Sequence, residues 1–260
     1  MQIESPTLVL ATIDLSFHHA AAGVVRAILE KHGVNVIELR APHEQAFGLL
    51  ENGGADMLCS AWLPGSHGTY YDRLADDFAP LTVLYTPYAL WGVPEYVPRE
   101  MVSSVRDLTR PDVQQRMNKL IQGINPGAGI SRFSLEIFEH YGLAGLGYSF
   151  RNGSLDDCVA AFERAVQKGE WVVVPLWQPQ YLFAKNRIRE LADPDGLLRG
   201  KDDATLVLRK NRLRDLPAAA IHELRTTTLG NEEATRLDYL VSRENMSPLE
   251  AARNFLEHRK

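Results

Sequence analysis

The segment 7–39, TLVLATIDLSFHHAAAGVVRAILEKHGVNVIEL, shows most clearly which fold class the chain adopts. Residues 7–13 form an apolar run of strand length, residues 20–32 are amphipathic, and residues 34–39 alternate between apolar and polar side chains. Gly33, directly after the basic end of the amphipathic stretch, is a common helix stop. This order predicts a strand, a helix and a second strand, which together make the βαβ unit of a parallel sheet.

The alternation continues along the rest of the chain. After this unit we expect the following elements: a helix at 44–52, strands at 56–61, 120–124, 147–151, 171–176 and 203–209, and helices at 133–141, 154–168, 216–224, 232–243 and from Pro248 onward. Residues 81–97 are apolar and contain two prolines, which predicts a crossover between lobes. We therefore expect an α/β protein of two lobes joined by two crossover segments, each lobe a mainly parallel sheet flanked by helices. Lobe I would comprise residues 1–88 and 207–260, and lobe II residues 89–206.

Composition excludes several classes of protein. The 260 residues are 45% hydrophobic with a formal net charge of -5, and no basic stripe suited to nucleic acid is present. No apolar stretch approaches the roughly 20 residues that span a bilayer. The first residues lack a secretory signal, so the chain is expected to be either cytosolic or a mature form whose leader is absent. Cys59 and Cys158 are too few and too far apart for a disulfide framework or zinc site, and are predicted to be buried thiols.

Two tryptophans, Trp62 and Trp177, each follow an apolar strand and precede a proline and a polar turn. Ligands of open α/β folds bind beyond the carboxyl ends of the strands, and an indole face attracts a quaternary ammonium. The structural alternative is that both rings pack the core, and position alone leaves both interpretations open. Tyr88 and Trp91 in the expected crossover are further candidates for an aromatic box, whereas Trp171 begins a strand and is predicted to be core.

Two strand-to-helix connections could bind an anion through backbone N–H groups. The first contains Leu15, Ser16, Phe17 and His18 and leads into the first helix, where the free N–H groups and the positive end of the dipole would face a carboxylate. The alternative is that Asp14 or Ser16 caps this helix and the imidazoles face solvent.

The second connection is residues 123–131, which include Gly129 and Ile130. Its glycines allow close approach of a ligand to the backbone. It matches neither the phosphate-loop nor the dinucleotide spacing, which disfavours a nucleotide.

Catalytic and metal-binding motifs are not found in the sequence. There is no nucleophile elbow, no His-Glu-x-x-His and no cluster of carboxylates and histidines with metal spacing. His67 near Asp72, and the pair Asp156 and Asp157, are interpreted as turn and helix-start residues, since acidic side chains favour first helical turns. We therefore predict no catalytic residues, no metal and no cofactor.

Several segments together resemble the glycine betaine/choline-binding family of ABC-transporter substrate-binding proteins, which have the type II two-lobed periplasmic binding fold. They are 56–68 with Ala-Trp-Leu-Pro and a histidine, 123–130 with Pro-Gly-Ala-Gly-Ile, 172–183 with Trp-x-Pro-x-Tyr-x-Phe, and the shorter stretches 191–194 and 206–210. The resemblance implies that Trp62 and Trp177 are two walls of a quaternary-ammonium box. It also implies that the backbone of residues 15–18 binds a betaine carboxylate.

The sequence departs from the family in its C-terminal part. Betaine-binding relatives have a third tryptophan and a histidine there, whereas residues 224–231 of this chain contain neither. The third wall is therefore expected from Tyr88, Trp91 or Phe17. Choline-type members have an asparagine near Ser131, so the Pro-Gly-Ala-Gly-Ile form favours betaines.

The function that the resemblance implies is binding without chemistry. The chain is expected to be the substrate-binding component of an ABC importer, with a small quaternary-ammonium ligand such as glycine betaine, a permease as partner, and a periplasmic or extracytoplasmic location. The alternative is a cytosolic small-molecule sensor or enzyme built on the same two-lobed fold, because a fold by itself does not fix function.

Overall fold

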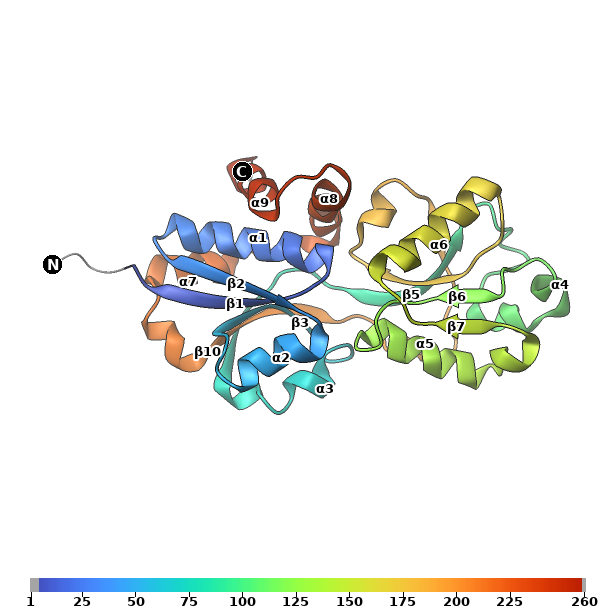
Figure 1. Ribbon diagram of the computed structural model, residues 1–260, viewed down its shortest axis with the longest axis horizontal. Helices are drawn as coiled ribbons and strands as arrows, with labels where there is room; N and C mark the ends of the chain where they lie inside the picture. Colours follow the sequence, from blue (N-terminus) through green and yellow to red (C-terminus); the bar gives the residue numbers. More distant parts are fainter. Residues whose placement is uncertain (1–4, 259–260) are drawn as a thin grey trace. The chain divides into compact units, whose positions relative to one another are not determined.

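The βαβ unit expected at the start of the chain is present. In the computed structural model, which describes residues 5–258, β1 (Thr7–Ile13), α1 (Ser16–Lys31) and β2 (Asn35–Ala41) follow one another (Figure 1). The two strands pair in parallel, from Thr7 opposite Asn35 to Ile13 opposite Ala41. The helix begins at Ser16, four residues before the amphipathic stretch 20–32, and His18 in its first turn is buried.

The first unit is built on a five-stranded sheet in the order β2-β1-β3-β10-β4. Its remaining strands are β3 (Met57–Leu63), β4 (Phe78–Val83) and β10 (Asp203–Arg209). β3 is parallel to β1, whereas β10 runs antiparallel to both β3 and β4. Six of the seven residues of β3 are buried, as expected for a strand covered on both faces.

Helices cover both faces of this sheet. They are α1 with α2 (His43–Glu51), α3 (Gly68–Tyr71), α7 (Ala218–Thr226), α8 (Gly230–Arg243) and α9 (Pro248–His258). Figure 1 shows α1 and α9 on one face and α2 and α3 on the other. Gly23 allows α1 and α9 to approach closely, because a Cβ there would lie 2.3 Å from the carbonyl oxygen of Pro248.

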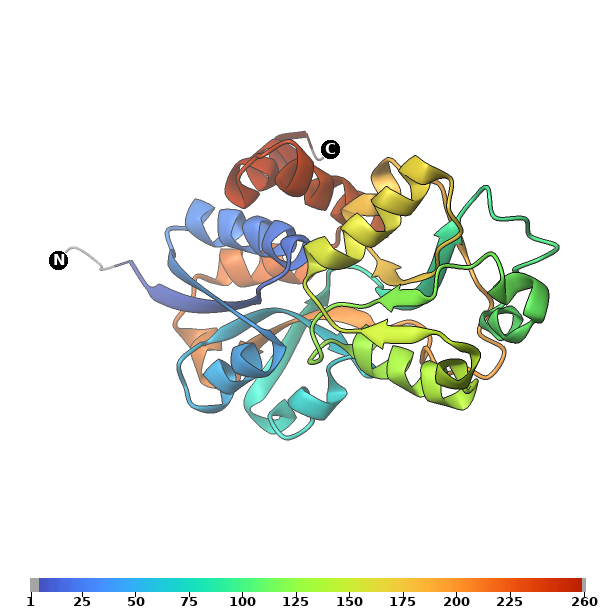
Figure 2. The ribbon, with the colours of Figure 1, turned by 45° about the vertical axis from the view of Figure 1, so that its right-hand side comes forward.

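The second unit contains a small antiparallel sheet and a parallel pair of strands. The sheet has the order β8-β5-β9, from β5 (Tyr88–Pro94), β8 (Val174–Gln178) and β9 (Ile188–Glu190), and the pair is β6 (Leu120–Gln122) with β7 (Ser149–Arg151). Its helices are α4 (Pro111–Gln114), α5 (Gly129–His140) and α6 (Leu155–Lys168). Figure 2 shows α5 and α6 on opposite sides of these strands.

The expected α/β class is confirmed, but two details of the architecture differ from expectation. Residues 81–97 contain the expected crossover, since the chain passes from the first unit to the second between residues 87 and 88, but they are also paired, because their first part completes β4 and residues 88–94 form β5. The expected mainly parallel sheet is present in the first unit, whereas β5 of the second unit pairs antiparallel with both of its neighbours.

The chain passes between the two units four times, whereas the sequence predicted two crossover segments. Within the described residues, the first unit contains 5–87, 179–184 and 202–258, and the second contains 88–178 and 185–201. The sequence-based boundaries assigned 179–184 and 202–206 to lobe II. These residues belong to the first unit because the short 3₁₀ helix Tyr181–Ala184 packs against α8, and because β10 pairs with β3 from Asp203 onward.

None of the helices between residues 5 and 258 combines the length and apolar character needed to span a membrane.

Candidate functional site

Trp62 lies at the carboxyl end of β3, where it is surrounded by four other rings of the first unit. Its indole retains 7% exposure. The ring centroids nearest to it are those of Phe17 at 5.2 Å, His18 at 5.4 Å, His67 at 5.9 Å and Tyr85 at 6.2 Å. We call these five residues the Trp62 cluster. The sequence pointed to Trp62, Phe17 and His18, but it gave no signal for Tyr85.

Hydrogen bonds fix the orientation of Trp62 within the cluster. Its backbone N–H donates to Nδ1 of His67 at 2.9 Å, and its indole N–H donates to the hydroxyl of Tyr85 at 3.3 Å. Burial raises the pKa of Tyr85 above its ordinary value, so the phenol stays neutral. Trp62 is therefore held at its backbone by His67 and at its indole by Tyr85.

The first turn of α1 has no side-chain cap. Leu15 occupies the N-cap position in extended conformation, and neither Asp14 nor Ser16 caps the helix as the structural alternative required. The backbone N–H groups of the first turn therefore lie at the positive end of the helix dipole without a side-chain acceptor. A carboxylate is the kind of group that this arrangement stabilises.

His18, in this first turn, is buried and neutral. The side chain is 1% exposed, which contradicts the alternative interpretation that it faces solvent. Burial, followed by the charges of His43 and His19, holds the pKa of His18 well below its usual value. His19, in contrast, lies 3.0 Å from Asp14, which is exposed. Of the two imidazoles, His18 belongs to the Trp62 cluster.

A buried carboxylate on α8 lies beside the segment that follows β8. Asp238 is fully buried and accepts the backbone N–H of Tyr181 at 2.7 Å and the hydroxyl of Ser242 at 3.1 Å. Burial raises the pKa of Asp238 to about 6, against the opposing effects of the Ser16 side chain and of these two hydrogen bonds. The sequence did not indicate this group, because an aspartate on an amphipathic helix is typical of a solvent-facing position.

In the second unit, Trp177 lies on β8 opposite Ala89 of β5 and is 2% exposed. Gly129 and Ile130 form the first turn of α5, whose N-cap, Ala128, provides no side-chain cap. The start of α5 thus repeats the uncapped helix start of α1. The structure places these predicted residues on β8 and α5 of one unit.

The two other candidate walls of the second unit are engaged in local contacts. Trp91 is fully buried on β5, and its indole N–H donates to Ser134 of α5 at 2.8 Å. The hydroxyl of Tyr88 donates to Glu190 at 2.8 Å, and the ammonium of Lys201 lies 6.0 Å from the centre of its ring. Trp91 is thereby anchored to α5, and a cation already lies near the Tyr88 ring.

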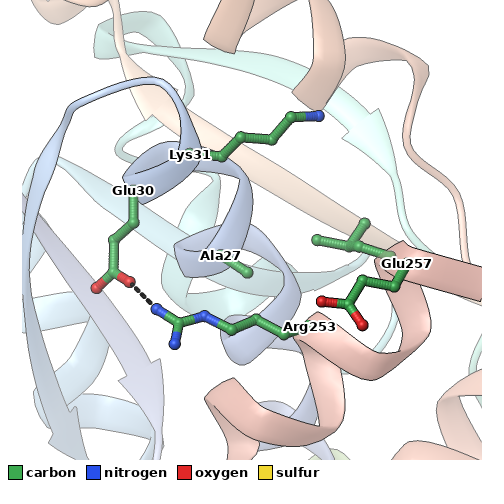
Figure 3. A pocket seen from close by; sticks show the side chains of 6 residues that line it. Ala27, Glu30, Lys31, Arg253 and Glu257 are labelled. Atoms are coloured by element: carbon green, nitrogen blue, oxygen red, sulfur yellow. Dashed lines mark hydrogen bonds and ion pairs between the residues drawn. The ribbon is translucent and has the colours of Figure 1, made fainter.

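A pocket of about 380 Å³ lies between α1 and α9 in the first unit (Figure 3). Glu30 and Arg253 in its wall form an ion pair of 3.2 Å, and Lys31 pairs with Glu223 at 2.9 Å. No aromatic ring lines the pocket. It lies at the last turn of α1, about 20 Å along the helix from the Trp62 cluster. Glu30, Lys31 and Arg253 in its wall are each paired with an opposite charge, and the lining offers no aromatic surface for a quaternary ammonium.

The residues set aside as turn or helix-start positions behave as expected. Asp157 forms a capping box with Ser154 at the start of α6, and His67 accepts a backbone hydrogen bond instead of pairing with Asp72 for chemistry. Both cysteines are buried free thiols, and burial raises the pKa of Cys158 to about 12. Within residues 5–258, no group of three or more histidine, cysteine or acidic side chains is arranged to hold a metal.

Comparison with known proteins gives consistent matches. The OpuAC family, described as the substrate binding domain of an ABC-type glycine betaine transport system, matches residues 6–258. The glycine betaine/carnitine transport binding protein GbuC of Listeria monocytogenes is 22% identical over 149 residues, which is 57% of this chain and 49% of that protein. The chain thus spans about half the length of this curated relative.

Solved structures show the fold. Lactococcal OpuAC in its closed-liganded conformation with glycine betaine has a TM-score of 0.84 at 24% identity, covering 97% of this chain and 96% of that chain. The glycine/betaine/L-proline-binding protein ProX of Borrelia burgdorferi has a TM-score of 0.83 at 24% identity, covering 96% and 92%. The fold that the sequence predicted is therefore confirmed.

Proposed function

The chain belongs to the family of substrate-binding domains of ABC-type glycine betaine transport systems, and we propose that it binds a small quaternary-ammonium zwitterion for import. The observation that carries the proposal is the Trp62 cluster, in which an indole is fixed among neutral rings at a strand end. Glycine betaine and related betaines are the ligand class that best fits this chemistry.

Trp62 is the proposed aromatic contact of the first unit. A desolvated quaternary ammonium over an indole face gains about 2 kcal/mol or more. Phe17, with its centroid 5.2 Å from that of Trp62 and its plane tilted by 38°, is the proposed additional wall. This choice is supported by Trp91 being anchored to Ser134 and by the lysine beside Tyr88.

Trp177 is the proposed aromatic contact of the second unit. It follows the apolar residues of β8 just as Trp62 follows those of β3. Gly129 and Ile130 are proposed as backbone contacts from the uncapped start of α5.

The carboxylate of the ligand is proposed to bind the first turn of α1, through the backbone of Leu15, Ser16, Phe17 and His18. The turn has no side-chain cap, and the neutral His18 adds no competing charge of either sign. Recognition would combine a helix N-terminus for the anion with aromatic faces for the cation.

The remaining parts of the proposal concern the setting. We propose an extracytoplasmic protein that presents its ligand to a permease, and binding without a chemical step. An enzyme or sensor is less favoured, since the imidazole nitrogen Nδ1 of His67 is occupied by a backbone N–H and Asp157 serves as a helix cap.

Isothermal titration calorimetry tests the proposal with glycine betaine, proline betaine, carnitine and choline. Glycine betaine is expected to bind and to raise the melting temperature by mass action. The matched control is 3,3-dimethylbutanoate, which has the same shape with a carbon in place of the charged nitrogen, and it is expected to bind far more weakly. Absence of binding to all four ammonium compounds, or equal binding of the isostere that lacks the ammonium charge, would contradict the proposal.

A further inference from the structure

The turn after β3 is closed by a reciprocal pair of hydrogen bonds between Trp62 and His67. The backbone N–H of His67 donates to the carbonyl of Trp62 at 2.8 Å, and the backbone N–H of Trp62 donates to Nδ1 of His67 at 2.9 Å. β1 pairs with β3 as far as Thr12 opposite Cys59, so Trp62 lies beyond the end of that ladder. The imidazole supplies an acceptor where the neighbouring strand no longer does.

This hydrogen bond fixes the protonation and the place of the His67 ring. A nitrogen that accepts an N–H carries no proton, so the proton of the neutral ring is on Nε2. The ring is 1% exposed and lies between aromatic neighbours from α1 and α2. Its centroid is 6.1 Å from that of His18, 5.3 Å from that of His43 and 5.5 Å from that of Phe47. The imidazole is therefore held in one orientation against the indole.

A second contact fixes the other side of the same turn. The carboxylate of Asp202 accepts the backbone N–H of Gly65 at 2.6 Å and that of Ser66 at 2.9 Å, and the side chain is 6% exposed. Asp202 directly precedes β10, which pairs with β3. Hydrogen bonds to an ionised carboxylate are stronger than neutral ones. The turn is thus tied to the sheet as well as to the ring of His67.

We propose that His67 is a positioning residue for ligand selectivity: it holds the Trp62 backbone and indole in the orientation that recognises a fully methylated ammonium, with Asp202 fixing the turn that carries it. The inference rests on the proposed function, because it takes Trp62 as a ligand contact. Cation–π attraction requires the cation within about 6 Å of the ring centroid, so a change in ring orientation weakens contact with the methyl groups. His67 itself need not touch the ligand.

Two substitutions of His67 test whether the hydrogen bond to the Trp62 backbone matters, or only the presence of a polar side chain at position 67. In His67→Asn the amide oxygen takes a place close to that of Nδ1 and can accept the Trp62 N–H, whereas in His67→Gln the amide lies one carbon further out. Calorimetry measures the dissociation constants for glycine betaine and for dimethylglycine, which lacks one methyl group. Melting temperatures are measured alongside. The exposed His222→Gln serves as the control for loss of a histidine.

We expect His67→Gln to weaken glycine betaine binding about tenfold, the usual effect of losing one buried hydrogen bond. The ratio of the two dissociation constants should fall toward one, because dimethylglycine depends less on the aromatic contact. His67→Asn should keep both the affinity and the ratio. Loss of stability alone would lower the melting temperature without changing the ratio.

The outcomes separate the inference from the proposed function. The inference is overturned if the ratio is unchanged in His67→Gln, or if His67→Asn loses as much affinity as His67→Gln. The proposed function still stands in that case, provided that the wild type binds glycine betaine and that Trp62→Leu loses this binding. Failure of the wild type to bind any quaternary ammonium overturns both. If His67→Gln does not fold, Asp202→Asn tests the same turn from its other side. Asp202→Asn should lower the ratio of the two dissociation constants, whereas the control variant Asp203→Asn, at the exposed neighbouring position, should not. An unchanged ratio in Asp202→Asn overturns the inference.

Discussion

Replacing Asp238 by asparagine should change how the stability of the first unit depends on pH. Asp238 is fully buried, and its pKa is raised from 3.8 in the unfolded chain to about 6 in the folded protein. Between these values the folded state binds more protons than the unfolded state, so stability falls as pH rises. Its contribution is fully present below pH 3.8 and is lost as pH rises through about 6.

The size of the effect follows from the gap between the two pKa values. At about 1.4 kcal/mol per pKa unit, the gap corresponds to about 3 kcal/mol in total, of which about 2 kcal/mol is lost between pH 4.5 and 8. Asparagine has no charge to bury, and its amide oxygen can still accept the N–H of Tyr181. The stability of the Asp238→Asn variant relative to wild type should therefore rise by about 2 kcal/mol over this pH interval.

Hydrogen exchange measured by mass spectrometry on peptides from α1 and α8 gives the opening free energy of this unit at each pH. Subtracting the wild-type curve from the variant curve removes the contribution of every other titrating group. A difference between the curves that is the same at every pH would reflect only the pH-independent effect of the substitution. If the difference stayed constant from pH 4.5 to 8, the prediction would be refuted, because Asp238 would then have the same pKa in the folded and unfolded states.

Five further substitutions, at four positions, test the aromatic contacts and the core around them. Trp62→Leu should weaken glycine betaine binding about 30-fold, since about 2 kcal/mol of cation–π attraction is lost, and Trp62→Phe should fall between; calorimetry showing wild-type affinity in both would exclude this ring. Trp177→Leu should likewise lose affinity for glycine betaine. Trp91→Phe loses the hydrogen bond to Ser134, so it should lower the melting temperature and leave the affinity unchanged. Reduced affinity in Trp91→Phe would show that Trp91 contacts the ligand. Gln180 is fully buried and its amide has no hydrogen-bond partner among residues 5–258, so Gln180→Met should stabilise the protein by about 1 kcal/mol or more in thermal unfolding; a lower melting temperature would contradict this.

The regular elements were largely predictable because their hydrophobic patterns are local. β1 and β10 have the predicted limits, Thr7–Ile13 and Asp203–Arg209, since in each an apolar run is bounded by polar or turn-forming residues. The amphipathic pattern of residues 20–32 did not include the first turn of α1, which contains the adjacent histidines His18 and His19. The antiparallel β8-β5-β9 sheet was missed because strand direction depends on pairing between distant segments, which periodicity does not reveal.

The candidate site was predictable where a residue follows a strand, as Trp62 and Trp177 do. The partners of Trp62 were harder to find. Tyr85 lies between β4 and β5, and Asp202 contacts Gly65 from more than 130 positions away in the sequence. His67 was noticed as a histidine in a turn, but its contact with the backbone of Trp62 depends on the geometry of that turn. The supporting contacts are tertiary and carry no sequence periodicity.

The central position of β10 has a consequence for synthesis. β10 separates β3 from β4 in the first sheet, although it is made after the whole of the second unit. While the ribosome is producing residues 84–202, the nascent first unit has β1, β2 and β3 but lacks the strand that joins β3 to β4, and the β3 edge remains unpaired. The second unit, complete at residue 201, can therefore fold first. The five-stranded sheet of the first unit cannot be completed until residue 209 has been synthesised.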